Sequence, residues 1–204
     1  MSLKIRLAHD FLCPWCWISV SQVRTLTQEF DIEVEWEGFE LFPEALEWPE
    51  DAGPAPVENP DKPKTPSRLG LAYAAENMDA PKAVRPEHMR THNALQAVEY
   101  AKTEGDPFPF IERLYSAYWE KGLEINQLEV LKLLAQGLIH DVEAMLGAVA
   151  NRQFADRIVG FDDDAYAAGV YNVPTFFIAG ERYAEQPTRT LRTAIRNAIT
   201  PTHV

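Results

Sequence analysis

Two cysteines, Cys13 and Cys16, separated by a proline and a tryptophan, constrain this chain more than any other feature of its sequence. The sequence of 204 residues contains no other cysteine. A stabilising disulfide usually links distant segments, because closing a very short loop removes little entropy from the unfolded chain. Two thiols three residues apart on a helical turn lie close enough to form a disulfide and to reopen it. The spacing therefore predicts redox chemistry.

The two cysteines lie at a predicted junction between a strand and a helix. Residues 3–8 alternate between apolar and polar side chains, which is typical of a strand. Pro14 suits the first turn of a helix, where its missing N–H needs no partner. The residues from Trp17 to Phe30 predict an amphipathic helix that ends near Asp31, and residues 32–37 alternate again as a second strand. The start of the chain is therefore predicted to be β-α-β.

A long helical region is expected after a Pro-rich, acidic surface loop at residues 42–66. Helical patterns occupy residues 86–102 and 110–118, and a last helix is expected at 154–168, closed by Gly169. Asn126 with Glu129 has the spacing of a capping box, and Asp141 is expected to cap the helix that follows.

The end of the chain returns to strand character. Residues 175–178 and 182–184 predict a hairpin, and Thr188 is expected to cap a final helix. The element order predicts an α/β fold, β-α-β followed by helices and then β-β-α. It divides the chain into one domain from residues 1–66 and 170–204, with a helical insertion domain at 67–169.

The position of each cysteine predicts its role. Cys13 lies at the helix N-terminus, where free N–H groups and the helix dipole favour a thiolate, and such sites hold thiol pKa values from roughly 3.5 to 7.5. Cys16 lies one turn deeper. We therefore expect Cys13 to be the nucleophile and Cys16 to resolve the mixed disulfide.

Zinc binding and inert burial account for the pair less well than redox chemistry does. A structural zinc site needs two more ligands, and the five histidines have no ligand spacing, so we expect no metal. Two inert buried cysteines are the stronger alternative. Their position at a strand-to-helix junction argues against it.

The neighbours of the pair allow several roles. Asp10 would oppose a thiolate at Cys13, or help to move a proton through water, or tie the loop. His9 is expected to be a surface histidine. The helical spacing of Tyr115, Tyr118 and Trp119 predicts core residues, with lining of a cleft beside the insertion as the alternative.

The sequence resembles the DsbA family of thioredoxin-like proteins, and most closely its FrnE-like branch. The resemblance rests on DFLCPWC at residues 10–16, on a helix around residues 91–101 and on GVYNVPTF at residues 169–176. Proline at the start of a strand is tolerated because no ladder bond is lost there. The resemblance implies a thioredoxin-like fold with an all-helical insertion, a cis Pro174 against the disulfide, and a Val173 backbone that pairs with an extended substrate.

Between the cysteines, Trp15 is expected either to contact substrate and tune the redox poise or simply to pack. The function expected is exchange of disulfides with protein or small-molecule thiols, without a cofactor beyond the Cys13–Cys16 disulfide. Glutathione stays open as a co-substrate.

Two other functions are carried as alternatives. One is a glutathione-dependent isomerase of the hydroxychromene-carboxylate type, although such relatives place Ser where Cys13 stands and lack the second cysteine. The other is a non-catalytic module that binds partners through the acidic surface and the Pro-rich loop.

The charge limits the partners. A net charge of −12 argues against nucleic acid or an anionic membrane, since both need a basic face. The start of the chain has no apolar run of signal-peptide length, so a cytoplasmic protein is expected. In a reducing cytosol, reduction or isomerisation of disulfides is favoured over their formation.

Overall fold

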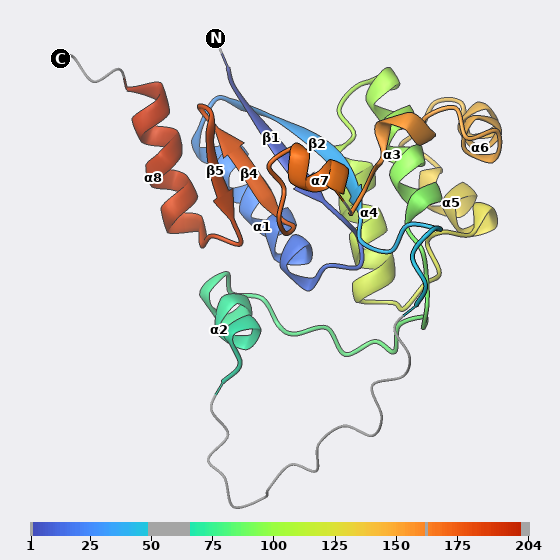
Figure 1. Ribbon diagram of the computed structural model, residues 1–204, viewed down its shortest axis with the longest axis horizontal. Coiled ribbons are helices and arrows are strands. Elements are labelled where there is room, and N and C mark those ends of the chain that lie inside the picture. The colour runs from blue at the N-terminus through green and yellow to red at the C-terminus, as the bar shows by residue number, and fades with distance from the viewer. Residues whose placement is uncertain (1, 49–65, 162, 201–204) are drawn as a thin grey trace, which may run out of the picture.

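The computed structural model describes residues 2–48, 66–161 and 163–200 (Figure 1). Most of the predicted Pro-rich loop, residues 49–65, lies outside the described residues. The helices and strands of the described residues follow in chain order: β1 Leu3–His9, α1 Pro14–Glu29, β2 Ile32–Glu40, α2 Arg68–Ala75, α3 His92–Glu104, α4 Phe108–Trp119, α5 Leu128–Ala135, α6 Val142–Ala150, the 3-10 turn η1 Ala155–Arg157, β3 Val159–Gly160, α7 Asp163–Ala167, β4 Thr175–Ile178, β5 Glu181–Ala184 and α8 Thr188–Ile199.

Within the described residues, a mixed sheet of five strands forms the centre of the fold, in the order β3-β2-β1-β4-β5. β1 and β2 are parallel, as are β2 and β3, whereas β4 runs antiparallel to both β1 and β5. The predicted β-α-β unit and the terminal hairpin are therefore confirmed. The register pairs Ala8 with Thr175, which brings the strand end before the cysteines beside the segment that follows Pro174.

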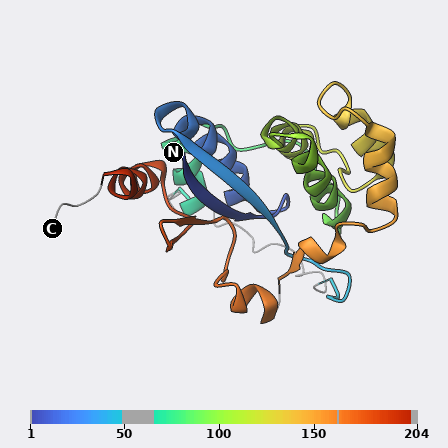
Figure 2. The same ribbon diagram turned by 90° about the horizontal axis from the view of Figure 1, so that it is seen from above.

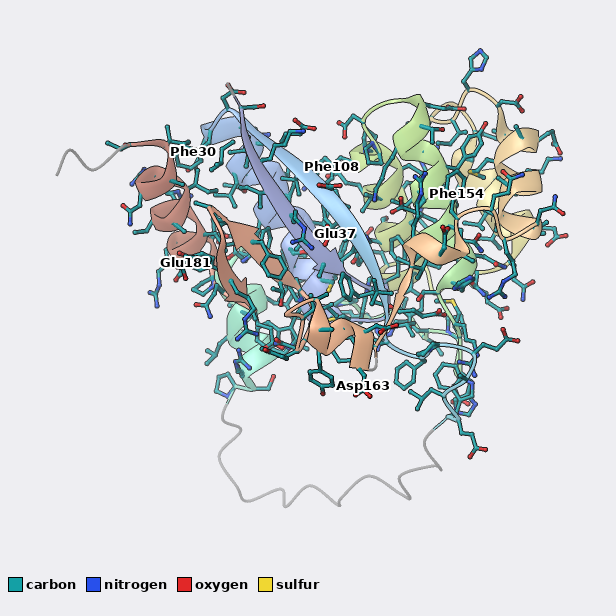
Figure 3. The ribbon with its side chains drawn as sticks, turned by 45° about the horizontal axis from the view of Figure 1, so that its top comes forward. Phe30, Glu37, Phe108, Phe154, Asp163 and Glu181 are labelled. Atoms are coloured by element: carbon teal, nitrogen blue, oxygen red, sulfur yellow. The ribbon has the colours of Figure 1, made fainter. Side chains whose placement is uncertain are left out.

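Helices cover the sheet from two parts of the chain. α1 contacts α8, and α8 also packs on β4, while α4 contacts α1 from the insertion side (Figure 2). In Figure 3, Phe154 lies among the insertion helices and Phe30 lies on the other side of the molecule, near α8. The Phe154 ring meets Tyr100 of α3 edge-on, with centroids 6.3 Å apart. Arg196 of α8 lies 5.9 Å from the centroid of the Phe30 ring.

The last helix predicted for the insertion is wrong. Residues 154–168 form η1, β3 and α7 in place of one helix. β3 pairs with the end of β2, and the Phe161 N–H extends this pairing by donating to the Glu40 carbonyl at 2.9 Å. The apolar residues of this segment have helical spacing in the sequence, but they pack against the core from separate elements. Gly169 ends α7 with a φ of +76°, the left-handed conformation that glycine allows.

The insertion therefore adds a strand to the sheet as well as helices. The division into two domains stays a prediction.

One of the N-terminal helix caps predicted for the insertion is confirmed and the other is wrong. The Asp141 carboxylate accepts from the Ala144 N–H at 2.9 Å, which confirms this cap. The capping box is wrong, because α5 begins after Gln127 and its N-cap has no side-chain hydrogen bond. Asn126 instead accepts from the Asn93 N–H at 2.8 Å and receives the Asn93 amide at its carbonyl, so it joins α3 to the start of α5. The helix predicted from residue 86 begins only at residue 92.

Among the described residues, no helix combines the length and the apolar character needed to cross a membrane.

Candidate active site

The two cysteines lie at the N-terminus of α1, at different depths. Cys13 is the N-cap residue, with an extended backbone, and its carbonyl accepts from the Cys16 N–H at 3.0 Å and the Trp17 N–H at 3.2 Å. Pro14 occupies the first turn, as its fixed φ predicts. Cys13 is 6 % exposed to solvent and Cys16 is fully buried, and both are free thiols. A substrate therefore has access to Cys13 alone.

The segment before β4 lies against Cys13. The Val173–Pro174 peptide bond is cis. The Cys13 thiol donates to the Val173 carbonyl, with sulfur and oxygen 3.1 Å apart. The loop is held on both sides, because the Thr175 hydroxyl donates to the Asn172 carbonyl at 2.6 Å and the Glu185 N–H donates to the Pro174 carbonyl at 3.0 Å. Residues 160 positions apart in the chain thus form one site.

Burial separates the chemistry of the two thiols. The pKa of Cys16 lies well above its ordinary value, because burial penalises the thiolate and the adjacent Cys13 sulfur adds to this. The backbone of Asp10 opposes the rise by hydrogen bonding, and the Asp10 charge supports it. Cys16 is thus held as a thiol until the reaction changes its surroundings.

Asp10 ties the loop before Cys13 to two other elements. Its carboxylate accepts from the Leu12 N–H at 2.7 Å, the Leu41 N–H at 2.9 Å and the Thr91 hydroxyl at 2.8 Å. Burial raises its pKa from 3.8 to about 6, against the lowering effect of these three hydrogen bonds. The loop-tying role left open by the sequence is therefore present in the structure.

His9 is not a surface histidine, so that prediction is wrong. It ends β1 with no exposed area. Burial lowers its pKa from 6.5 to about 3, with a smaller effect from Lys102. The Tyr115 hydroxyl donates its single hydrogen to the Asp10 carbonyl at 3.1 Å, so the His9 Nδ1–H must donate to the Tyr115 oxygen at 3.0 Å. This fixes the tautomer and leaves Nε2 buried without a hydrogen-bond partner among the residues that the structure describes.

The aromatic residues of α4 support the active-site loop. Tyr115, Tyr118 and Trp119 are buried, which confirms the core prediction from their helical spacing. The Trp119 indole N–H donates to the Phe11 carbonyl at 2.9 Å, beside the hydrogen bond of Tyr115 to the neighbouring Asp10 carbonyl. Burial raises the pKa of Tyr115 well above its usual range, with Cys16 and Cys13 adding to the effect. Helical spacing could predict the burial but not these hydrogen bonds.

Helix α2 brings residues to the site that sequence reasoning missed. The Arg68 guanidinium lies 4.6 Å from the centroid of the Trp15 ring, between the two cysteines in the chain. Arg68 pairs with Glu185 at 2.8 Å, and the other Glu185 oxygen accepts from the Asn172 amide at 2.9 Å. This bridge reaches from α2 to the loop before Pro174. The role of Trp15 in contacting a substrate stays a prediction.

The other end of α2 is fixed to α8. The Glu76 carboxylate accepts from the Thr188 N–H at 3.2 Å, the Thr188 hydroxyl at 2.6 Å and the Gln22 amide at 3.3 Å. The predicted cap role of Thr188 is therefore wrong, since α8 has Pro187 at its N-cap and Glu76 binds its first N–H from a distant segment. The acceptor comes from 112 residues away, where local capping rules give no signal.

Metal ligands do not gather anywhere in the described parts of the chain, where no group of three or more His, Cys, Asp or Glu side chains could hold an ion.

Comparison with known proteins places nearly the whole chain in one family. Residues 4–196 match the family described as DSBA-like thioredoxin domain. Among solved structures, a probable DsbA oxidoreductase from Streptomyces coelicolor, SCO1869, is 21 % identical with a TM-score of 0.71, covering 99 % of this chain and 93 % of that one.

Two further structures are similar in fold. A 2-hydroxychromene-2-carboxylate isomerase is 14 % identical, with a TM-score of 0.65 and 95 % of each chain covered. The cytosolic disulfide reductase DsbM of Pseudomonas aeruginosa, solved with GSH, is 18 % identical with a TM-score of 0.62, covering 95 % of this chain and 100 % of that one. At these identities the likeness concerns the fold.

Proposed function

The chain belongs to the DSBA-like thioredoxin domain family of thiol–disulfide oxidoreductases, and we propose that Cys13 and Cys16 are its redox couple. One observation carries the proposal. The Cys13 thiol lies 3.1 Å from the Val173 carbonyl at the surface end of α1, with Cys16 fully buried beneath it. An outer thiol that a substrate can reach and an inner one that it cannot are what a two-step exchange requires.

In the first step, the Cys13 thiolate attacks one sulfur of a substrate disulfide. A Cys13–substrate S–S bond forms, the substrate disulfide breaks, and its second sulfur leaves as a thiolate. In the second step, Cys16 loses its proton and attacks the Cys13 sulfur, so the Cys13–Cys16 disulfide forms and the remaining substrate thiolate leaves. The substrate gains two electrons and the protein loses two. Oxidation of a substrate follows the same steps in reverse.

Asp10 is the candidate acceptor for the Cys16 proton. It is fully buried, its charge acts on Cys16, and with a pKa of about 6 it is mostly ionised at neutral pH and so able to accept a proton. The Val173 carbonyl, which accepts from Cys13 before substrate arrives, becomes free to pair with an extended substrate once the thiol has reacted. Pro174 follows Val173 through the cis peptide bond and is proposed to border the same sulfur, where it has no N–H to compete for it. Trp15, beside Cys13, is the third residue proposed to contact substrate.

We further propose that the protein works in the cytoplasm as a reductase or isomerase of disulfides. The fold similarity to the cytosolic disulfide reductase DsbM supports this direction. The net charge of −12 supports protein or small-molecule thiols as partners, and neither nucleic acid nor membrane. No cofactor is needed beyond the two cysteines. Membership of the FrnE-like branch is proposed on the DFLCPWC segment.

Glutathione is a second candidate substrate, favoured by the similarity to a disulfide reductase solved with GSH. The isomerase alternative has a similar fold in its favour. The presence of both Cys13 and Cys16 favours thiol exchange, because neither the isomerase nor a binding module needs two thiols. A binding module would keep full activity in cells when both cysteines are replaced by serine.

Trapping of the intermediate tests the proposal. The Cys16→Ser variant is mixed with a disulfide-containing protein and quenched with acid and an alkylating reagent. We expect a mixed disulfide through Cys13, identified by mass spectrometry. The Cys13→Ser variant is the matched control and should trap nothing, since its remaining thiol is buried. Trapping through Cys16, or none in either variant, would reject the assignment.

A further inference from the structure

A buried tyrosine hydroxyl without a partner lies on the active-site side of α2. Helix α2 runs along the first half of α1, because Arg68 at its start lies over Trp15 and Glu76 after its end contacts Gln22 (Figure 1). Tyr73 lies between these two contacts. The residue is 4 % exposed, and its hydroxyl forms no hydrogen bond with any of the described residues. A buried hydroxyl that lacks a partner is unfavourable, so this group is poised to bind one that arrives.

An exposed arginine, Arg85, contacts the aromatic residues that support the active-site loop. The exposed Arg85 guanidinium is 4.5 Å from the centroid of the Trp119 ring, and Trp119 itself binds the Phe11 carbonyl two residues before Cys13. No carboxylate in the described parts of the chain forms an ion pair with Arg85. Arg68, the other arginine beside the site, is already neutralised by Glu185.

Both tyrosines near Arg85 lie within the reach of its charge. Burial raises the pKa of Tyr73 to about 12 and that of Tyr118 above its ordinary value, and in each case Arg85 opposes the rise. Tyr118 and Arg85 contact the same ring, because Tyr118 meets the Trp119 ring edge-on with centroids 5.2 Å apart and the Arg85 guanidinium lies over it. Cys13 also raises the pKa of Tyr73. Trp119 connects Arg85 to the loop before Cys13, because its ring lies under the guanidinium and its indole N–H donates to the Phe11 carbonyl.

We propose that Arg85, Tyr73 and Tyr118 form a carboxylate-binding subsite beside Cys13, which selects disulfides that carry a carboxylate close to the reacting sulfur. The inference rests on the proposed function and names the substrate class of the same site. A guanidinium with two neighbouring hydroxyls offers charge-assisted hydrogen bonds that fit a carboxylate. In a chain with a net charge of −12, a local cation offsets the repulsion that an anionic substrate meets.

The reaction is the first step described above, with the subsite holding the substrate. Cys13 attacks the disulfide sulfur nearest the bound carboxylate, the Cys13–substrate bond forms, and the distal half leaves as a thiolate. Two sources share this chemistry: a small thiol such as glutathione, with carboxylates near its sulfur, and a peptide with an acidic residue beside its cysteine.

Three small disulfides of different charge test the subsite in the Cys16→Ser background. Glutathione disulfide is anionic, bis(2-hydroxyethyl) disulfide is neutral and cystamine is cationic. The second-order rate constant for the mixed disulfide with Cys13 is followed by mass spectrometry. Arg85→Gln is expected to slow glutathione disulfide about 10-fold, to leave the neutral disulfide unchanged and to accelerate cystamine. Tyr73→Phe is expected to slow glutathione disulfide alone.

The matched control is Arg196→Gln, which removes another arginine that contacts an aromatic ring, at the far end of α1 near Phe30. It should change none of the three rates. A loss of equal size for all three disulfides in Tyr73→Phe would mean that the hydroxyl serves the Cys13 thiolate, and it would overturn the subsite. Unchanged rates in Arg85→Gln would overturn it as well.

The source of the carboxylate is decided with peptides. Disulfide-linked peptides with Asp or with Asn beside the cysteine are compared with glutathione disulfide. Faster reaction of the Asp peptide, lost in Arg85→Gln, supports the subsite with a protein substrate, whereas an advantage confined to glutathione disulfide supports it with a small thiol. If the Cys16→Ser protein reacts with no disulfide at all, the proposed function itself fails, which is a different result from a loss of charge preference.

Discussion

Replacement of His9 by Phe is expected to remove part of the acid sensitivity of the fold. The neutral ring of His9 is buried against Phe11, Trp36 and Tyr115, with Nε2 unpartnered. Protonation would place a charge and an unpaired N–H, at Nε2, in this apolar site, which is why burial lowers the pKa from 6.5 to about 3. Phenylalanine fits the aromatic surroundings, and Tyr115 keeps its hydrogen bond to the Asp10 carbonyl.

The sign and size of the effect follow from linkage. The unfolded chain binds a proton at His9 below pH 6.5 and the folded protein does not until about pH 3, so the stability contributed by this group is present above pH 6.5 and is lost as the pH falls. At pH 5, about 1.5 pKa units below the unfolded value, the loss is about 2 kcal/mol, because one unit corresponds to about 1.4 kcal/mol. Near pH 7 the loss is close to zero.

Asp10 changes the pH dependence of folding stability in the opposite direction, so its effect must be separated from that of His9. Its pKa rises from 3.8 to about 6 on folding, so folding is favoured below pH 4 and the advantage is lost as the pH rises to 6. His9 is not among the charges that shift it. Asp10 therefore titrates equally in the wild type and in His9→Phe, and its contribution cancels in their difference.

Urea denaturation of both proteins at pH 7 and pH 5 measures that difference. Relative to the wild type, His9→Phe should gain about 2 kcal/mol in free energy of unfolding between pH 7 and pH 5. A difference that does not change with pH would refute the buried, neutral histidine.

Three other substitutions have expected outcomes. Thr91→Val removes the hydroxyl that binds Asp10 and lowers its pKa, so that pKa should rise further in a pH titration by NMR, with a loss of about 1 kcal/mol in urea unfolding. Glu76→Ala removes the acceptor for the first N–H of α8 and should cost about 1 to 3 kcal/mol, with faster amide exchange at Thr188. Asp141→Ala removes the α6 cap and should lower the free energy of unfolding by about 1 kcal/mol, without a change in thiol exchange.

The parts of the fold that were predicted from sequence are those that local rules determine. The alternation in β1 and β2 and the proline after Cys13 place the cysteines at a strand-to-helix junction, because strand periodicity and helix-end preferences act over a few residues. The hairpin of β4 and β5 was predicted in the same way, from the turn between two strand patterns. The Asp141 cap is also a local motif.

The surroundings of the site could not be predicted, because they depend on contacts between distant segments. His9 is buried by a tyrosine 106 positions later, and nothing near it in sequence indicates this. Helix α2 is eight residues long, too short to give a clear periodicity, and Arg68 and Glu76 gain their partners only through Glu185 and Thr188. Where three short elements together follow one apolar period, as in residues 154–168, the period indicated a single helix that does not form.

The central claim is that Cys13 and Cys16 exchange two electrons as one couple. The direct test is equilibration of the protein in a series of glutathione redox buffers, followed by alkylation of free thiols and mass spectrometry. We predict that both thiols disappear together in a single two-electron transition, with about 30 mV for each tenfold change in the ratio of reduced to oxidised protein. Thiols that stay free across the whole series, or a transition of one thiol alone, would contradict it.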